Sequence, residues 1–266
     1  YHAADDVRRE LLVLWNVVAF FITYARLGGW STDRPVVGAV QVPDTARSAM
    51  DRWILSRVAG LAVEARTGLA EFDARAATQA ISTVIDDLST WYLRRSRRRF
   101  SRSDDAADRD AAFGVLHLAL VSLARISAPI LPFLGDELHA VLVKPTQPDA
   151  PESIHLTPWP DAELAPLRDV ALEAAMADLR RAVELGRTLR GQAGLKVRQP
   201  LARLWLALPG GRLGGVADEG FRDELLALMA DELNVKAVEL IGDESELVER
   251  RVKPLLPVIG KKHGSR

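Results

Sequence analysis

The chain has 266 residues, of which 48% are hydrophobic and 27% charged, as in an ordinary soluble protein with one large or two modest domains. Its formal net charge is −1, so a nucleic-acid site would have to be a local patch and not a property of the whole surface. The absence of cysteine excludes disulfides, thiolate metal ligands and a cysteine nucleophile. Because the first residue is Tyr1 and not Met, we expect a segment of a longer protein.

The first part of the chain is predicted to be a bundle of helices, because apolar residues recur there at spacings of three and four. The first helix should end at Gly28 and Gly29, and Asp73 should cap the third. The fourth helix is apolar on nearly every side, so it should form the buried centre of the bundle. The apolar stripes of the predicted helices lie in residues 5–26, 50–69, 77–92, 111–128 and 133–142.

A proline-rich connector, residues 144–161, follows the bundle and sets the predicted domain boundary. We therefore expect a helical-bundle domain over residues 1–160 and a second domain over residues 161–266. The fold class is predicted to be mainly α, with the bundle followed by a small α/β C-terminal domain.

The second domain should begin with a long helix over residues 167–190. Two short β-prone runs, residues 201–208 and 235–241, lie on either side of a further helix that carries Phe221 and Leu233. This order of elements predicts a small α/β unit.

The third predicted helix ends in a basic stretch, residues 91–100, with the sequence Trp-Tyr-Leu-Arg-Arg-Ser-Arg-Arg-Arg-Phe. No Asp or Glu lies three or four positions from these arginines, so pairing along the helix does not neutralise them. One interpretation is a solvated helix end whose arginines pair with acids elsewhere in the fold. The other is a nucleic-acid site, because interleaved arginine and aromatic side chains suit phosphates and unstacked bases together.

The sequence shows no catalytic constellation. The five histidines are scattered, without the close pairing on one helix face that a zinc site needs, and His117 has the apolar neighbours of an ordinary bundle residue. Asp86 and Asp87 are adjacent on a helix, so they point to different faces and cannot converge on one substrate atom. The basic end, Lys261-Lys262-His263, is interpreted as a frayed terminus, with an RNA-phosphate contact as the alternative.

Several motifs occur along the chain in a fixed order. In the bundle they are Leu14-Trp15-Asn16, Phe20-Phe21, Tyr24-Ala25, Asp51-Arg52-Trp53-Ile54-Leu55-Ser56-Arg57, Asp86-Asp87-Leu88-Ser89, Trp91-Tyr92-Leu93-Arg94-Arg95-Ser96-Arg97-Arg98, Ala128-Pro129-Ile130-Leu131-Pro132-Phe133, Asp136-Glu137-Leu138, Ser153-Ile154-His155-Leu156 and Trp159-Pro160. Beyond the bundle they are Gly194-Leu195-Lys196-Val197-Arg198-Gln199-Pro200-Leu201 and Asn234-Val235-Lys236. Together they resemble the C-terminal part of the isoleucyl-tRNA synthetases, from the helical anticodon-binding domain to the carboxyl end. The last two motifs look like the region that distinguishes the isoleucine enzymes from the valine and leucine ones.

The resemblance implies an ATP-dependent class I ligase whose full-length form joins isoleucine to tRNA(Ile), with ATP and Mg²⁺ in its catalytic domain. The HIGH-like and KMSKS-like signatures and the editing domain of that family are absent here, so this chain alone should not aminoacylate. No cofactor or metal is expected in it, since the cysteine-rich zinc tail of some members is also missing. The implied partners are tRNA(Ile) and the catalytic domain of the same protein, with no membrane, and we expect a cytoplasmic monomer.

An anticodon loop presents splayed bases and closely spaced phosphates, so its receptor needs flat side chains for stacking and fixed cations for the backbone. The predicted tRNA-binding residues are Trp91 and Tyr92 as flat groups, Arg94, Arg95, Arg98 and Arg99 as phosphate contacts, and Lys196, Arg198 and Gln199 from the second domain. Trp53 is assigned to packing. The stretch from Lys196 to Leu201 also fits a turn packed against the bundle, and that alternative stays open.

Three alternatives to this function remain. The first is the matching domain of a valyl- or leucyl-tRNA synthetase, which the motif from Lys196 to Leu201 disfavours. The second is a helical protein-interaction module whose arginines bind an acidic partner. The third is a free-standing enzyme, for which a bound cofactor or activated amino acid would be the evidence.

Overall fold

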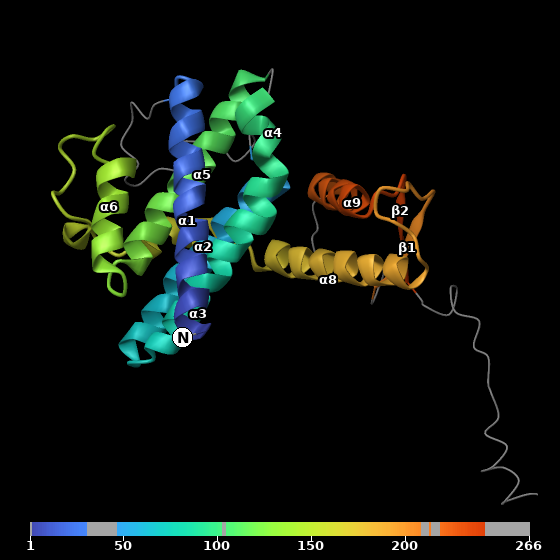
Figure 1. The fold of residues 1–266 in the computed structure, drawn as a ribbon, viewed down its shortest axis with the longest axis horizontal. Coiled ribbons are helices and arrows are strands. Elements are labelled where there is room, and N and C mark those ends of the chain that lie inside the picture. The colour runs from blue at the N-terminus through green and yellow to red at the C-terminus, as the bar shows by residue number, and fades with distance from the viewer. Residues whose placement is uncertain (1, 31–46, 103–104, 209–212, 214–218, 243–266) are drawn as a thin grey trace, which may run out of the picture. The chain divides into compact units, whose positions relative to one another are not determined.

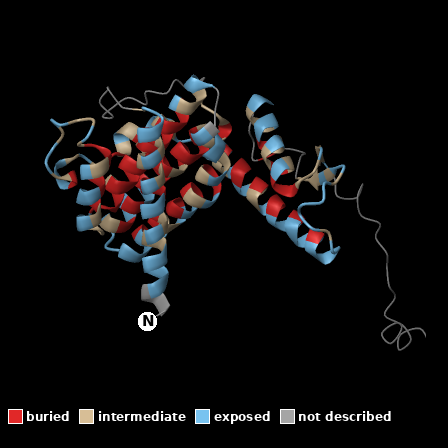
Figure 2. Ribbon diagram, turned by 45° about the horizontal axis from the view of Figure 1, so that its top comes forward, coloured by how far each residue is buried: buried red, intermediate tan, exposed pale blue. Residues whose placement is uncertain are grey.

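The computed structural model describes residues 2–30, 47–102, 105–208, 213 and 219–242. The chain forms two compact units, Tyr1–Met176 and Ala177–Arg266. Helices dominate the described parts of both units, and buried residues, red in Figure 2, alternate along the helices with exposed ones.

The first unit is a bundle in which helices cross one another (Figure 1). The helix α1 packs on α5, and α2 packs on both α3 and α5. In chain order the elements are α1 (His2–Leu27), α2 (Ala49–Ala70), α3 (Ala74–Asp86), η2 (Asp87–Leu93), α4 (Arg94–Arg102), α5 (Ala106–Ser127), α6 (Pro132–Leu142), η3 (Ile154–Leu156), α7 (Asp161–Leu164) and η4 (Ala165–Leu167). The mainly α architecture predicted from the apolar spacing is confirmed.

The helix α5 is the centre of this bundle, as its sequence predicts. Leu116 and Leu120 are at most 1% exposed, and buried residues occur on nearly every side of the helix. His117 stacks against Phe21 of α1, with ring centroids 5.4 Å apart. The assignments of His117 and of Trp53 in α2 to packing are confirmed, since both are at most 2% exposed.

Side-chain caps fix where the helices begin. The side chain of Asp73 accepts a hydrogen bond from Ala76 N at 2.9 Å, so the predicted cap of α3 is confirmed. At the start of α2, Ser48 and Asp51 accept each other's backbone N–H, which forms a capping box. After α1 the backbone of Gly29 has a φ of +65°, a conformation that glycine adopts readily, so the predicted end of this helix is also confirmed.

The long helix predicted between Asp73 and the arginines is interrupted. At Asp86 the helix α3 passes into the π-helical segment η2, and an α-helix resumes at Arg94 as α4. The sequence did not predict this change, because the spacing of Leu88 and Tyr92 fits the buried face of a continuous α-helix as well. The π-helical segment therefore lies directly before the basic stretch.

The segment after the connector packs on α2, so the first unit extends beyond the predicted boundary at residue 160. Trp159 Nε1 donates to the carbonyl of Ala62 at 3.0 Å, and Arg52 pairs with Asp169 at 3.2 Å. The helix α8 (Val170–Gln192) then begins in the first unit and continues into the second.

The second unit contains the rest of α8, then β1 (Leu204–Ala207), α9 (Glu219–Leu233) and β2 (Val238–Ile241). The two strands are parallel, so α9 lies in the crossover of a β-α-β arrangement, and the predicted small α/β unit is confirmed. A Cβ atom on Gly186 of α8 would lie 2.7 Å from Leu233 Cδ1, so glycine at this position permits the close approach of α8 and α9.

The helix α1 is apolar on more than the face that it buries. Leu12 is 50% exposed and Trp15 is 42% exposed. By length and composition both α1 and α5 could cross a membrane, but 78% of the apolar window in α5 is buried, as in the core helix of a bundle. Within the part of the chain that the structure describes, α1 is left with an uncovered apolar strip.

Candidate nucleic-acid interface

Five arginines of α4, between residues 94 and 99, differ in how far they are buried. Arg94, Arg97 and Arg98 are exposed, whereas Arg95 and Arg99 are half-buried. Arg98 makes no ion pair with any residue that the structure describes. These five arginines are therefore not equivalent, and the two half-buried ones lie where the apolar stripe of the third predicted helix continues.

Arg99 is tied to acids of two other helices. Its Nη1 lies 2.8 Å from the Asp51 carboxylate of α2, and its Nη2 lies 2.7 Å from the Asp108 carboxylate of α5. Although burial alone would lower it, hydrogen bonds with Asp51 and Asp108 raise the pKa of Arg99 above its ordinary value. The phosphate role predicted for Arg99 is therefore replaced by a structural one, the pairing with distant acids that was the open alternative.

Tyr92 is also a core residue. Its ring is 0% exposed, and its hydroxyl donates to Asp51 Oδ1 at 2.8 Å. Burial and the adjacent carboxylate of Asp51 raise the pKa of Tyr92 well above its ordinary value, so the hydroxyl keeps its proton. The predicted stacking of a base on Tyr92 does not fit this burial, because a base could reach the ring only if the core opened.

Trp91 lies at the edge of the core, with 9% of its surface exposed. The guanidinium carbon of Arg94 lies 5.7 Å from the Trp91 ring centroid, a distance at which cation and ring attract. Arg94 Nε also donates to the carbonyl of Thr90 at 2.7 Å. The Trp91 ring therefore packs against the guanidinium of Arg94, and this exposed guanidinium is the group that a ligand would contact.

A cavity of about 440 Å³ lies between α1 and the basic stretch, and we call it the basic pocket. Arg94 and Arg97 belong to its lining, and Arg97 Cζ lies 5.7 Å from the ring centroid of Phe20. The Phe20 ring in turn meets Phe100 edge-on at 5.5 Å. The lining residues are Val13, Asn16, Val17, Phe20, Ser89, Leu93, Arg94 and Arg97. The pocket thus joins apolar side chains to two guanidinium groups and one amide.

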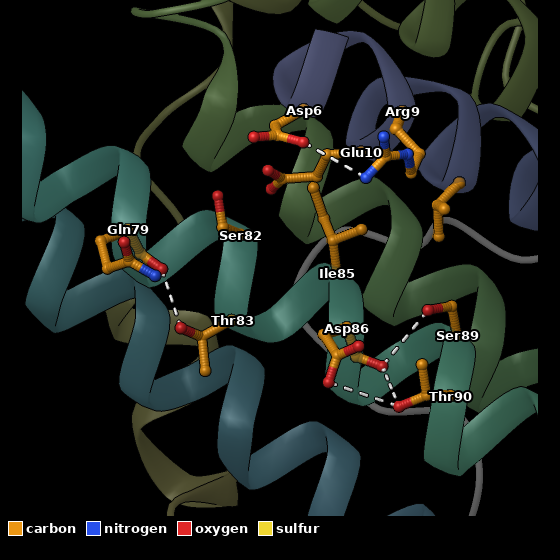
Figure 3. A pocket seen from close by; sticks show the side chains of 11 residues that line it. Asp6, Arg9, Glu10, Gln79, Ser82, Thr83, Ile85, Asp86, Ser89 and Thr90 are labelled. Carbon is orange, nitrogen blue, oxygen red and sulfur yellow. Dashed lines mark hydrogen bonds and ion pairs between the residues drawn. The ribbon is translucent and has the colours of Figure 1, made fainter. Parts of the chain in front are cut away.

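A second cavity of about 440 Å³ adjoins the basic pocket along α1, since Val13 and Ser89 line both. Figure 3 shows Asp6 and Glu10 of α1 on one side of it and Asp86 on the other. We call it the acidic pocket. Its arginine, Arg9, is paired with Asp6 at 3.2 Å, so carboxylates dominate its charge. The sign of the charge therefore changes along a single helix.

The predicted tRNA-binding residues of the second unit lie on an exposed turn. Lys196, Arg198 and Gln199 are all exposed, and Gln199 N donates to the carbonyl of Lys196 at 2.9 Å. Asn234 Nδ2 donates to the carbonyl of Val197 at 3.0 Å. The structure thus joins the two sequence motifs that lie beyond the bundle.

The remaining titratable candidates have structural partners. Asp87 pairs with Arg57 at 2.8 Å and is buried, whereas Asp86 is exposed, so the two adjacent acids point to different faces as predicted. Among the described residues no group of three or more His, Asp or Glu side chains could hold a metal ion. The basic end at residues 261–263 lies outside the described residues.

The basic pocket contains three residues that the sequence prediction missed. Asn16 and Phe20 lie one helical turn apart on α1, and Arg97 was left out of the predicted set although its neighbours were included. The sequence offered one signal for them, because Asn16 interrupts an otherwise apolar run. That signal shows a polar position but does not say which helix faces it.

Comparisons with known proteins show the family of this chain. Residues 51–204, more than half of the chain, match the family model described as the anticodon-binding domain of tRNA ligase. Over 98% of its length the chain is 40% identical to the isoleucine–tRNA ligase of Thermus thermophilus, 41% identical to that of Thermobifida fusca and 36% identical to that of Chlamydia muridarum. It spans about a quarter of the length of these relatives, 24%, 23% and 24% respectively. This chain belongs to the family of the anticodon-binding domains of tRNA ligases.

Proposed function

We propose that this chain binds the anticodon region of tRNA(Ile) as part of an isoleucine–tRNA ligase. Its family membership and its similarity to isoleucine–tRNA ligases over almost its whole length support this function. The structural observation that carries the proposal is the basic pocket, because it combines an apolar floor with Arg94 and Arg97. An unstacked nucleotide has the same combination of a flat base and a charged phosphate.

In this proposal a base of the anticodon loop enters the basic pocket. Val17 and Leu93 provide apolar contact with the base, and the amide of Asn16 can both donate to a base edge and accept from one. The guanidinium groups of Arg94 and Arg97 hold the adjoining phosphates, which planar guanidinium binds through two parallel hydrogen bonds.

The acidic pocket limits where the RNA can lie. Carboxylates of Asp6, Glu10 and Asp86 repel phosphate, so the backbone should approach from the end of α1 that carries the basic pocket. Arg95 and Arg98 remain proposed contacts for further phosphates, because they extend the basic surface along α4. Trp91 takes part through Arg94, whose guanidinium lies over its ring.

The activity of the whole protein is part of the same proposal. The full-length form would join isoleucine to tRNA(Ile), with ATP and Mg²⁺ held by residues outside this chain, and would act in the cytoplasm as a monomer. This chain alone would be catalytically inactive. The exposed Leu12 and Trp15 on α1 would pack against the rest of the polypeptide, since the relatives are about four times as long as this chain.

A titration with tRNA tests the proposal. The chain is mixed with tRNA(Ile) and with the same tRNA carrying a changed anticodon, at about 50 and about 200 mM salt, because phosphate contacts release counterions and weaken as salt rises. We expect tighter binding to the cognate anticodon. Equal affinity for both tRNAs would contradict anticodon recognition, and equal affinity for an acidic polypeptide would favour a protein partner.

Two variants connect the binding to the pocket. Arg97→Gln should reduce the slope of log affinity against log salt by about one, as the loss of one phosphate contact predicts. The matched control is Arg75→Gln, since Arg75 is exposed on α3 and does not line the basic pocket. If the two variants bind tRNA equally well, the basic pocket is not the site.

A further inference from the structure

The turn at residues 196–199 is held in shape by a buried arginine. Arg190, in the last turn of α8, is 5% exposed. Its Nη2 donates to the carbonyl of Lys196 at 2.8 Å and also to the carbonyl of Gln199. Asn234, the residue directly after α9, donates a hydrogen bond from its side chain to the carbonyl of Val197. The carbonyl oxygens of the turn are thus directed inward, toward donors of the protein.

Within the part of the chain that the structure describes, no acid neutralises the charge of Arg190. No carboxylate among the described residues pairs with it, and its Nε and Nη1 atoms are buried without a hydrogen-bond partner. A buried charge is normally paired, because removal from water is costly for an ion that has no counter-ion. Among the described residues of the second unit, a positive charge without a counter-ion therefore lies directly beneath an exposed turn.

The backbone pairing of the second unit brings a third cation to this turn. Leu201 N donates to the carbonyl of Asn234 at 3.0 Å, and Lys236 N donates to the carbonyl of Leu201 at 3.0 Å. These bonds hold the exposed Lys236 beside the segment that continues from Lys196 and Arg198. Lys236, which is far away in the sequence, thus joins the exposed Lys196 and Arg198 and the buried Arg190.

We propose that Lys196, Arg198 and Lys236 form a second RNA site, which takes phosphates of the backbone, and that Arg190 is its positioning residue. This inference rests on the proposed function, since it names a further contact for the same ligand. The projecting cations donate hydrogen bonds and attract anions without distinguishing bases. A phosphate held at the surface of the turn also supplies the negative charge that Arg190 lacks.

The site predicts binding that depends on salt but not on the anticodon. We expect Arg198→Gln and Lys236→Gln each to lower the slope of log affinity against log salt by about one for tRNA(Ile). When the salt concentration is raised fourfold, the factor by which affinity for tRNA(Ile) falls should be about threefold smaller for each variant than for the parent, because each variant lacks one phosphate contact. The ratio of affinities for cognate and changed anticodons should stay at the parent's value. The matched control is Arg181→Gln, because Arg181 is exposed on α8 of the same unit.

The role of Arg190 is tested with two substitutions of different charge. Arg190→Met keeps an apolar stem and removes the donors and the charge, so we expect the salt slope to fall by about two or more. Arg190→Lys restores a donor and a charge, so it should recover most of that slope. If Arg190→Met and Arg190→Lys have the same slope of log affinity against log salt while both variants stay folded, Arg190 acts through packing alone. If Arg190→Met does not fold, the Arg198 and Lys236 variants still decide whether the site exists.

The failures of the two proposals are distinguishable. If Arg198→Gln and Lys236→Gln keep the parent's slope while the parent still prefers the cognate anticodon, the second site is refuted and the anticodon function stands. If the parent shows no preference between anticodons, the anticodon function is refuted whatever the slopes are. A polyglutamate peptide tests for an acidic protein partner. If it competes with tRNA for the turn as strongly as an unrelated RNA does, the assignment to RNA is overturned in favour of an acidic protein.

Discussion

Tyr92→Phe separates a structural from an RNA-binding role for one of the two residues that the sequence predicts as stacking groups. The substitution keeps the ring and removes one hydroxyl, which donates to the fully buried carboxylate of Asp51 at 2.8 Å. Ser48 and Arg99 still donate to that carboxylate. A hydrogen bond to a charged group contributes about 1.5–3 kcal/mol to stability, so we expect the free energy of unfolding of the first unit to fall by that amount.

Urea unfolding followed by tryptophan fluorescence is a suitable assay. Of the six tryptophans only Trp205 lies outside the first unit, so the signal reports mainly on the bundle. In a thermal scan the same loss should lower the midpoint by roughly 3–12 °C, at about 2–4 °C per kcal/mol for a unit of this size. Affinity for tRNA should not change, measured well below the unfolding transition.

Arg98→Gln is the opposite control. Arg98 is exposed and has no ion pair among the described residues, so its replacement should change stability by no more than about 0.5 kcal/mol. Its affinity for tRNA should fall, with a salt slope lower by about one. The reasoning is refuted if Tyr92→Phe unfolds like the parent and binds tRNA less tightly, because the hydroxyl would then act on the ligand and not on Asp51.

Three further predictions concern the pocket and the pH dependence of stability. Phe20→Leu keeps an apolar side chain but removes a stacking face from the basic pocket, so tRNA affinity should fall by about 1–3 kcal/mol in the titration, and unchanged affinity would exclude stacking on Phe20. Burial lowers the pKa of His117, and the hydrogen bond from its ring to the Leu142 carbonyl opposes this only in part. The folded state therefore resists protonation of His117, so the free energy of unfolding should decrease as pH falls below about 6.5. In unfolding curves at several pH values, His117→Gln should weaken that decrease. Hydrogen bonds from Ser153 Oγ and Ile154 N lower the pKa of Asp136, so the stability that its carboxylate contributes is present above about pH 3.9 and is lost as pH falls through the lowered pKa. Asp136→Asn should speed hydrogen exchange at the Ile154 amide at neutral pH. An unchanged exchange rate would mean that this contact does not hold the connector.

Much of the fold follows from local sequence signals. The cap at Asp73, the apolar stripe of α5 and the glycine after α1 each act within one or two helical turns, so a reader of the sequence can recognise them. The same holds for the β-prone runs around α9. The division into units was harder to place, because Trp159 and Asp169 bind residues of α2 that lie far away in the chain.

The candidate site was less accessible, because its residues are sorted by contacts between helices. Arg98 and Arg99 are neighbours in the sequence with identical side chains, yet only Arg99 reaches the buried Asp51 and Asp108. Periodicity places Tyr92 on the apolar face, but an aromatic ring beside arginines is equally typical of a base-stacking site. Phe20 belongs to the pocket only because α1 packs beside α4. No spacing rule within one helix contains that information.

The π-helical segment η2 has a consequence for how this region can vary in length. It lies between the apolar stripe of α3, which is fixed by the core, and the arginines of α4, whose directions depend on the residues counted between them. Deleting one residue from Asp87–Leu93 would convert the wide turn into an ordinary α-helical one, and the wide turn would absorb the loss. Arg97 would then stay near the ring of Phe20, and Arg99 would stay near Asp51. The same deletion within α4, which is regular, would turn the residues beyond it by about 100° around the helix axis and would separate the later cations from the cavity.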